Sequence, residues 1–336
     1  MSKIKVSVLC TAYNHEKYIE KCLQGIIDQK TNFEFEILIN EDHSDDKTAD
    51  LIRMYESKYP KIIKPVYQTT NQYSKGINIV DDILFPKSKG EYIAFCEGDD
   101  YWIDEHKLQR QYEFMENHKS CVMCVGNTII HDLENKEKDR LFNHWRKSKK
   151  LKKEDIFLGW NVHTSTYFIR RDFLKIPDEF KKYWFGDYVR LTYNSSKGDV
   201  YYIPDIMSVY NHNNTNGLTN IFENSEIEKR KKLAMLRIEY LNQLNYKEEN
   251  QLNDIVNRSI NKVKLDIKIF ENSKIIATSE LKKDSISAAK SIYEDIGKKE
   301  YLYKKSAIQH IKFFVKYRGY FIYSIWKKGW KKGIFK

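Results

Sequence analysis

Residues 92–109 of the chain read YIAFCEGDDYWIDEHKLQ. The run from Tyr92 to Cys96 is apolar and has the length of a buried strand. It ends in Glu97-Gly98-Asp99-Asp100, which places three carboxylates within four residues. Carboxylates this close disfavour one another's charge unless a positive group lies among them. The stretch therefore predicts a strand that ends at a bound cation.

The residues around this stretch alternate between strand and helix patterns. Apolar, β-branched runs predict strands over 4–10, 33–40, 62–67 and 92–96. Helical spacing predicts helices over 16–29, 45–59, 77–84 and 104–117. This order predicts an α/β fold with a mostly parallel sheet and helices on both faces.

The pattern changes twice further along the chain. Residues 121–215 are mixed, with strands predicted over 122–126, 165–169, 200–203 and 207–210 and a short helix from Asp187. From about residue 224 the spacing is helical throughout. We therefore predict one domain over 1–220 and a helical region over 221–336.

Composition excludes several classes of protein. The chain has 336 residues, of which 31% are charged, and its uncharged stretches are shorter than the roughly 18 apolar residues of a membrane span. The first residues resemble a strand rather than a signal peptide, so we expect a cytoplasmic protein with reduced thiols. Cys121 and Cys124 have zinc-like spacing, but no second pair matches them, and core packing is the favoured interpretation.

The positive charge is concentrated at the C-terminal end. The net charge is +11, yet residues 304–336 contain ten Lys or Arg and no Asp or Glu. A helix over 311–326 would place Phe314 and Trp326 on its apolar side, which is typical of a segment lying at an anionic membrane surface. A helix packed on the body with a solvated basic end is the alternative. Nucleic acid is not expected, because no recognised motif accompanies the charge.

Three predicted strand ends carry polar residues, namely 11–14, 41–44 and 97–100. In open α/β sheets the ligand lies outside the carboxyl ends of the strands. No glycine-rich phosphate loop follows the first strand, which argues against a dinucleotide fold or a phosphate-cradling NTPase. A Mg²⁺ or Mn²⁺ ion held by carboxylates and substrate phosphates is the natural substitute.

Four stretches together resemble glycosyltransferase family 2, in order and approximate spacing. They are VSVLCTAYNHEKYIEKCLQGIIDQ, FEILINEDHSDDKT, GEYIAFCEGDDYW and FGDYVRLTYNSSKGDVYYIPDIMSVYN. The resemblance covers about 1–220 and implies a GT-A-like nucleotide-binding fold. It also implies an inverting transfer of a sugar from a nucleotide-diphosphate donor, for which we expect a UDP-sugar.

The resemblance implies a nucleotide site formed by Thr11, Ala12, Tyr13, Asp42 and Asp99. The Tyr13 ring would lie against the base, and Asp42 would accept a hydrogen bond from it. Asp99 would face the ribose or the diphosphate. We expect Tyr13 and Asp42 to lie at exposed strand ends.

Two further carboxylates receive roles from the same resemblance. Asp100 would bind the metal. Asp187 would be the general base that removes a proton from the acceptor hydroxyl. The alternative for Asp187 is an N-cap, and the two roles can coexist.

The chain departs from the family pattern at several positions. Cys10 stands where proline is usual, Glu41 and Glu97 where aspartate is frequent, and Asn211-His212 follows Tyr210 where arginine is frequent. A phosphate contact from that last position is therefore in doubt, and His212 is the candidate to supply it.

Two more residues are candidates for contact with the sugar or the acceptor. Trp102 would either pack under the acidic loop or stack on a sugar. His163 would either be a satisfied core residue or contact the acceptor.

We therefore predict a metal-dependent inverting glycosyltransferase at the inner face of the cell membrane, acting on a lipid-linked or cell-surface polysaccharide acceptor. Two other functions stay open at this point. A sugar-phosphate nucleotidyltransferase could use a similar sheet and metal, and a non-catalytic basic protein would bind through the tail alone.

Overall fold

The computed structural model describes residues 3–134, 139–183, 185–212, 214 and 227–278. The predicted membrane-binding segment 311–336 lies outside these residues. Contacts divide the chain into one compact unit of Met1–Asn224 and Gln243–Ile255, and a second of Ser225–Asn242 and Val256–Lys336. Residues 243–255 are fixed to the first unit by ion pairs such as Lys247 with Glu179, at 2.7 Å. The sequence pattern does not show this return of the chain.

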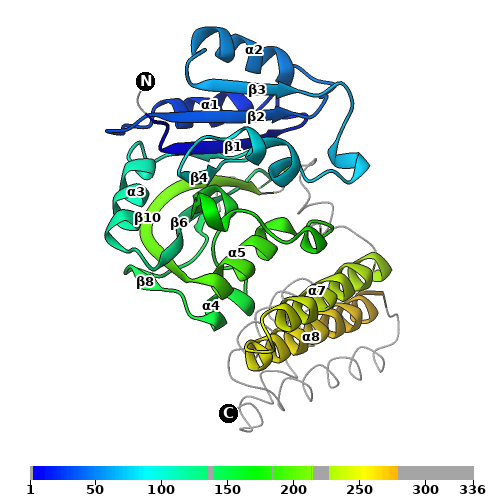
Figure 1. Ribbon diagram of the computed structural model, residues 1–336. Coiled ribbons are helices and arrows are strands. Elements are labelled where there is room, and N and C mark those ends of the chain that lie inside the picture. The colour runs from blue at the N-terminus through cyan, green and yellow to red at the C-terminus, as the bar shows by residue number, and fades with distance from the viewer. Residues whose placement is uncertain (1–2, 135–138, 184, 213, 215–226, 279–336) are drawn as a thin grey trace. The chain divides into compact units, whose positions relative to one another are not determined.

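Four parallel strands form one side of the sheet, as the alternating pattern predicts. In spatial order they are β3 (Ile63–Tyr67), β2 (Phe35–Glu41), β1 (Val6–Ala12) and β4 (Tyr92–Phe95). Figure 1 shows these strands side by side. Their carboxyl ends meet at one edge, which brings the three polar strand ends together.

Beyond β4 the sheet is mixed. β9 (Phe168–Arg170) runs antiparallel to both β4 and β6 (Cys121–Asp132), and β6 is parallel to β10 (Asp199–His212). The two strands predicted over 200–203 and 207–210 are one long strand, because register shifts between Tyr202 and Ser208 absorb the break in the pattern. Three two-residue strands were not predicted: β5 (Tyr101–Trp102), β7 (Arg140–Leu141) and β8 (Lys149–Lys150).

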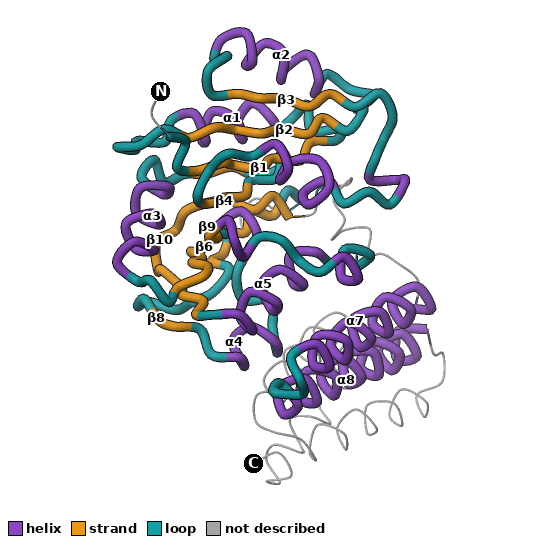
Figure 2. The backbone as a smooth tube through the Cα atoms, in the orientation of Figure 1, coloured by secondary structure: helices purple, strands orange, loops and turns teal. Residues whose placement is uncertain are grey.

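The helices of the first unit connect these strands. They are α1 (Ile19–Ile27), α2 (Thr48–Lys58), α3 (Lys107–Asn117), α4 (Lys153–Phe157) and α5 (Gly186–Lys197). Short helical turns lie at η1 (Tyr73–Lys75), η2 (Ile79–Leu84), η3 (Phe85–Lys87), η5 (Thr164–Thr166), η6 (Arg171–Phe173) and η7 (Asp178–Phe180). The helix predicted over 77–84 is the π-type turn η2, and η5 replaces the first half of the strand predicted over 165–169. The predicted α/β fold is confirmed (Figure 2).

Two longer helices follow, α7 (Ile227–Lys247) and α8 (Asn253–Thr278). They agree with the predicted change to a helical pattern. Within the described parts of the chain, none of the helices combines the length and the apolar character that crossing a bilayer requires.

The core beneath β4 contains three of the five cysteines. The Cys22 sulfur lies 3.7 Å from that of Cys96 and 4.0 Å from that of Cys10, and it also contacts the carbonyl of Glu97. All five cysteines are buried free thiols, which agrees with the predicted packing role. The acidic stretch therefore rests directly on tightly packed core.

Candidate active site

The acidic stretch forms a tight turn at the end of β4. The Gly98 amide donates to the Thr11 carbonyl at 2.9 Å, and the Asp100 amide donates to the Glu97 carbonyl at the same distance. A Cβ atom on Gly98 would lie 2.7 Å from Nδ1 of His15 and 3.0 Å from the Thr11 oxygen. Glycine is thus needed here because β1 and its following loop approach the turn closely.

Asp100 is fixed in the interior of the site, with only 1% of its surface exposed. Its Oδ1 accepts a hydrogen bond from the Asn211 amide at 3.0 Å, and its Oδ2 lies 3.6 Å from Nδ1 of His163. Burial, together with the charges of Asp99 and Glu97, raises the pKa of Asp100 well above its usual range.

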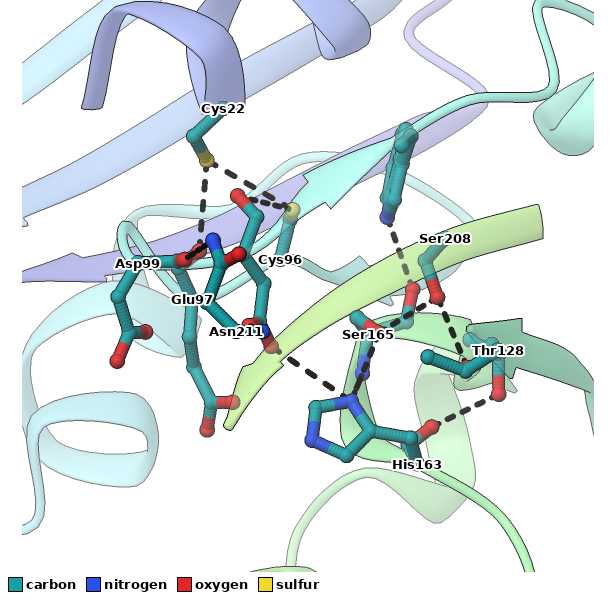
Figure 3. A network of polar contacts seen from close by, with 12 residues as sticks. Cys22, Cys96, Glu97, Asp99, Thr128, His163, Ser165, Ser208 and Asn211 are labelled. Atoms are coloured by element: carbon teal, nitrogen blue, oxygen red, sulfur yellow. Dashed lines mark hydrogen bonds and ion pairs between the residues drawn. The ribbon is translucent and has the colours of Figure 1, made fainter. Parts of the chain in front are cut away.

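Glu97, Asp100 and His163 converge on one point. One potential ligand atom from each lies within 4.8 Å of the others. Burial and the charges of Asp99 and Asp187 raise the pKa of Glu97 to about 8. Burial lowers the pKa of His163 to about 3, so the imidazole is neutral and one of its two ring nitrogens carries a lone pair. Figure 3 shows Glu97 and His163 pointing toward one another across the end of the sheet.

This donor set fits a divalent cation. Two carboxylates and an imidazole are suitable ligands for Mn²⁺, whereas Mg²⁺ prefers oxygen alone. The raised pKa values of both carboxyl groups indicate a site that lacks compensating positive charge by itself. The residues present would therefore accommodate the predicted metal, with Glu97 and His163 joining Asp100.

The His163 ring is held by a chain of hydroxyl groups. Its Nδ1 lies 2.8 Å from the Ser165 hydroxyl, which lies 2.8 Å from that of Ser208, which in turn is 2.9 Å from that of Thr128 (Figure 3). The ring also stacks on Tyr210, with centroids 4.4 Å apart. These contacts fix the orientation of the imidazole, as is usual for ligating histidines.

Trp102 packs against the segment that contains His163 and Ser165. Its indole nitrogen donates to the Ser165 carbonyl at 2.8 Å, and the ring is only 3% exposed. Lys107 lies over the ring, at 4.0 Å from the centroid. Of the two alternatives for Trp102, packing under the loop is therefore the one observed, and its ring presents no face to a sugar.

Asp99 lies beside this trio, and its charge contributes to the raised pKa values of Glu97 and Asp100. Its Oδ2 accepts a hydrogen bond from the Asn214 side chain at 3.1 Å and lies 3.9 Å from Nε2 of His15. Its carbonyl accepts from the Asn211 side chain at 2.5 Å. Asn211, which stands where the family pattern favours arginine, thus binds both aspartates of the turn. Nothing in its sequence position indicates this contact.

The nucleotide-site candidates gather at the ends of β1 and β2. The Ala12 carbonyl accepts from the Asp42 amide at 2.9 Å, and Tyr13 is 39% exposed, as expected. Asp42 was expected to be exposed, and this is wrong, because only 4% of it is. Its two carboxylate oxygens accept the amides of Gln72 and Tyr73, each at 3.0 Å, so the loop after β3 folds over it.

Asp187 lies in the first turn of α5. The N-cap position belongs to Phe185, so the alternative of Asp187 as the N-cap is wrong by two residues. Its carbonyl accepts from the Tyr167 hydroxyl at 3.4 Å. Because its charge is among those that raise the pKa of Glu97, its carboxylate lies close to the metal-site candidates. The helix dipole favours a negative charge at this end.

His212 is the last residue of β10, directly after Asn211. Its ring meets that of Tyr210 edge-on, with centroids 5.7 Å apart. The strand thus brings His212 to the same end of the sheet as Asp100.

Comparison with known proteins identifies the family. Residues 7–176 match the model of glycosyl transferase family 2. An uncharacterized protein of Mycobacterium tuberculosis is 29% identical over 209 residues, which are 61% of this chain and 58% of that protein. A poly(ribitol-phosphate) beta-glucosyltransferase of Bacillus spizizenii is 33% identical over 118 residues, 35% of this chain and 18% of that protein. The chain thus matches less than two thirds of the length of these relatives.

Two solved structures share the fold. Residues 1–349 of TarS from Staphylococcus aureus, in complex with UDP-GlcNAc, align over 87% of this chain and 81% of that one, with a TM-score of 0.56 and 17% identity. The mannosyltransferase PcManGT from Pyrobaculum calidifontis, with GDP-Man and Mn²⁺, aligns over 92% and 84%, with a TM-score of 0.53 and 13% identity. The family model matches half of the chain and agrees with the resemblance of the four motifs, so the chain belongs to glycosyl transferase family 2.

Proposed function

We propose that the chain is a metal-dependent inverting glycosyltransferase. It would move a sugar from a nucleotide-diphosphate donor, a UDP-sugar by preference, to a hydroxyl group of a lipid-linked or cell-surface polysaccharide acceptor. One observation carries the proposal: Glu97, Asp100 and His163 converge at the end of β4, with Asp187 near them on a separate helix.

In the proposed reaction, Glu97, Asp100 and His163 would hold a Mn²⁺ or Mg²⁺ ion. When bound, the ion would neutralise charge on the departing nucleoside diphosphate. The acceptor oxygen forms a bond to the anomeric carbon while the bond from that carbon to the phosphate oxygen breaks. The electron pair leaves with the diphosphate, and Asp187 takes the hydroxyl proton. A single displacement of this kind inverts the anomeric centre.

The nucleotide is proposed to lie against Tyr13, beside Thr11, Ala12 and Asp42. Both carboxylate oxygens of Asp42 accept backbone amides of the loop after β3, and each keeps a second lone pair with which to accept the proposed hydrogen bond from the base. Asp99 lies at the turn, where the ribose or the diphosphate would pass, and His212 is the candidate for a phosphate contact.

The relatives support the class of donor and acceptor. The TarS fragment was solved with UDP-GlcNAc, and the Bacillus spizizenii relative is named for a poly(ribitol-phosphate) acceptor and a beta linkage. The membrane surface at 311–336 and the cytoplasmic location stay predictions. Family membership favours a glycosyltransferase over the two alternatives, a nucleotidyltransferase and a non-catalytic basic protein.

The test is a panel of UDP- and GDP-sugars, scored by release of nucleoside diphosphate with and without a chelator. We expect one donor to be hydrolysed slowly, and a chelator to abolish the release. Asp100→Ala should be inactive, with Asp50→Asn on the exposed face of α2 as a control. Full activity in excess chelator would exclude the metal-dependent mechanism. Formation of a nucleoside triphosphate and a sugar 1-phosphate when pyrophosphate is added would favour the nucleotidyltransferase.

A further inference from the structure

Trp160 is a large aromatic residue at the surface beside the site. Its side chain is 41% exposed, although it lies in a loop between two buried elements. Its ring centroid is 5.7 Å from that of His163 and 6.1 Å from that of Tyr210. Phe142 meets it edge-on at 5.1 Å, with an interplanar angle of 87°. The ring is therefore packed against three aromatic side chains and still has a large exposed surface.

The loop that carries Trp160 is fixed by hydrogen bonds at several points. The Asn161 side chain donates to the Asp155 carbonyl at 2.7 Å, and the Asn161 carbonyl accepts from the Asn143 side chain at 3.0 Å. Gly159 lies close to the same side chain, because a Cβ there would lie 2.9 Å from the side-chain nitrogen of Asn161. The indole is thus held in one place before any ligand binds, which lowers the entropy lost on binding.

The loop that carries Trp160 contacts two parts of the candidate active site. At one end of this loop, Nδ1 of His163 lies 3.6 Å from Oδ2 of Asp100. At the other end, the Tyr188 hydroxyl donates to the Phe157 carbonyl at 3.0 Å, and Tyr188 directly follows Asp187 in α5. The loop of Trp160 therefore bridges the metal-site candidates and the helix that carries the proposed base.

We propose that Trp160, backed by Phe142 and Tyr210, is the platform on which a sugar ring of the acceptor lies. The inference rests on the proposed transferase function. A pyranose has one face of C–H bonds, which carry partial positive charge and are attracted to the electron-rich face of an indole. The acceptor hydroxyl must reach both the donor and the base, and the loop that carries this ring connects His163, beside Asp100, with a contact to α5. The donor's nucleotide would lie at the other strand ends, near Tyr13.

The test uses the full chain with Mn²⁺ and UDP, and simple sugars as probes. Methyl glucopyranoside and methyl N-acetylglucosaminide are titrated by saturation-transfer NMR, with acyclic ribitol as the probe without a ring. We expect transfer to the pyranoside C–H protons, and about 10-fold weaker binding in Trp160→Ala, the order of one lost aromatic contact. Trp160→Phe should recover part of the affinity. Tyr246→Ala, which removes an aromatic side chain that is 81% exposed elsewhere, should bind as the wild type does.

Several outcomes would overturn the inference. One is that Trp160→Ala and the wild type bind the pyranosides with equal affinity. A second is that the wild type gives no signal at ligand concentrations on the order of 0.1 M, at which a ligand with a Kd in the millimolar range would saturate the protein. Another is equally strong binding of ribitol. If Trp160→Ala slows hydrolysis of the donor in the absence of acceptor, the ring serves the donor's sugar instead. Failure of the proposed function shows separately, as absent UDP binding by wild type with Mn²⁺.

Discussion

Removal of one charge from a buried ion pair should reveal what holds α5 in place. Arg190 lies three residues after Asp187 in the helix. Its guanidinium donates to both carboxylate oxygens of Asp81 in η2, at 3.0 and 3.2 Å, and to the Leu174 carbonyl at 2.9 Å. The two side chains are only 5% and 1% exposed. The perturbation is Asp81→Asn, which keeps the shape and removes the charge.

The expected loss of stability follows from this burial. Breaking a buried pair by removing one partner costs about 3–5 kcal/mol, because the other charge stays buried without compensation. An asparagine oxygen still accepts one hydrogen bond, so the lower part of that range applies. At roughly 2–4 °C per kcal/mol for a unit of this size, the Tm should fall by about 6–12 °C.

Comparison with the reverse deletion sharpens the prediction. Arg190→Met should cost less than Asp81→Asn, because the carboxyl group left behind can take up a proton, whereas a guanidinium cannot lose one. The double variant Asp81→Leu/Arg190→Met should be more stable than Asp81→Asn alone, because it leaves no buried charge. Asp50→Asn breaks an exposed pair with Arg53 on α2 and should change the stability by less than about 1 kcal/mol.

The assay is thermal and urea unfolding followed by circular dichroism, together with steady-state kinetics below the transition. Because α5 carries Asp187, kcat for sugar transfer should fall in Asp81→Asn while the Kd for UDP stays near that of the wild type. An Asp81→Asn protein as stable as Asp50→Asn would refute the reasoning, because the pair would then contribute no more than a surface contact.

Three further outcomes are expected. Asp187→Asn should slow transfer by about two to four orders of magnitude, because an amide cannot accept the proton, and a near-normal single-turnover rate would show that the base lies elsewhere. In metal-free protein, the pKa of Glu97 is raised from 4.5 to about 8, so the stability that it contributes below pH 4.5 should be lost as the pH rises to about 8. Thermal unfolding at a series of pH values should show this slope, Mn²⁺ should reduce it, and a Glu97→Gln variant with an unchanged slope would contradict the assignment. Removal of 311–336 should release the protein from anionic vesicles in a flotation assay while sparing donor hydrolysis, and equal flotation of both forms would favour a packed helix instead.

The sequence predicted the parallel half of the sheet well because the burial of each of these strands can be inferred from its own run of apolar residues. The run before Glu97 is apolar at every position, and a strand covered on both faces requires this. The four motifs likewise selected Asp100 and Asp187, whose roles stay predictions. Local pattern and family resemblance were sufficient for these elements.

Contacts across long separations could not be predicted in the same way. Asn211 and Asp100 are 111 residues apart, and no periodicity relates an amide at the end of β10 to a carboxylate after β4. His163 was ambiguous because its neighbours in sequence are polar, while the rings that bury it come from other segments, such as Tyr210. Asp42 was expected to be exposed because the loop that covers it follows a different strand.

The separation between Asn211 and Asp100 also bears on the order of folding. The acidic turn is synthesised well before β10, the strand whose backbone amide stabilises it. Pairings between distant segments form late, because closing long loops costs entropy before any contact compensates for it. A chain emerging from the ribosome would therefore hold three crowded carboxylates that cannot yet bind a metal ion in the proper geometry. We expect amide exchange in a refolding experiment to protect Asn211 in the slowest phase, after the parallel strands β1, β2 and β4. If the proposed function holds, such an order would keep the unfinished chain from hydrolysing the donor.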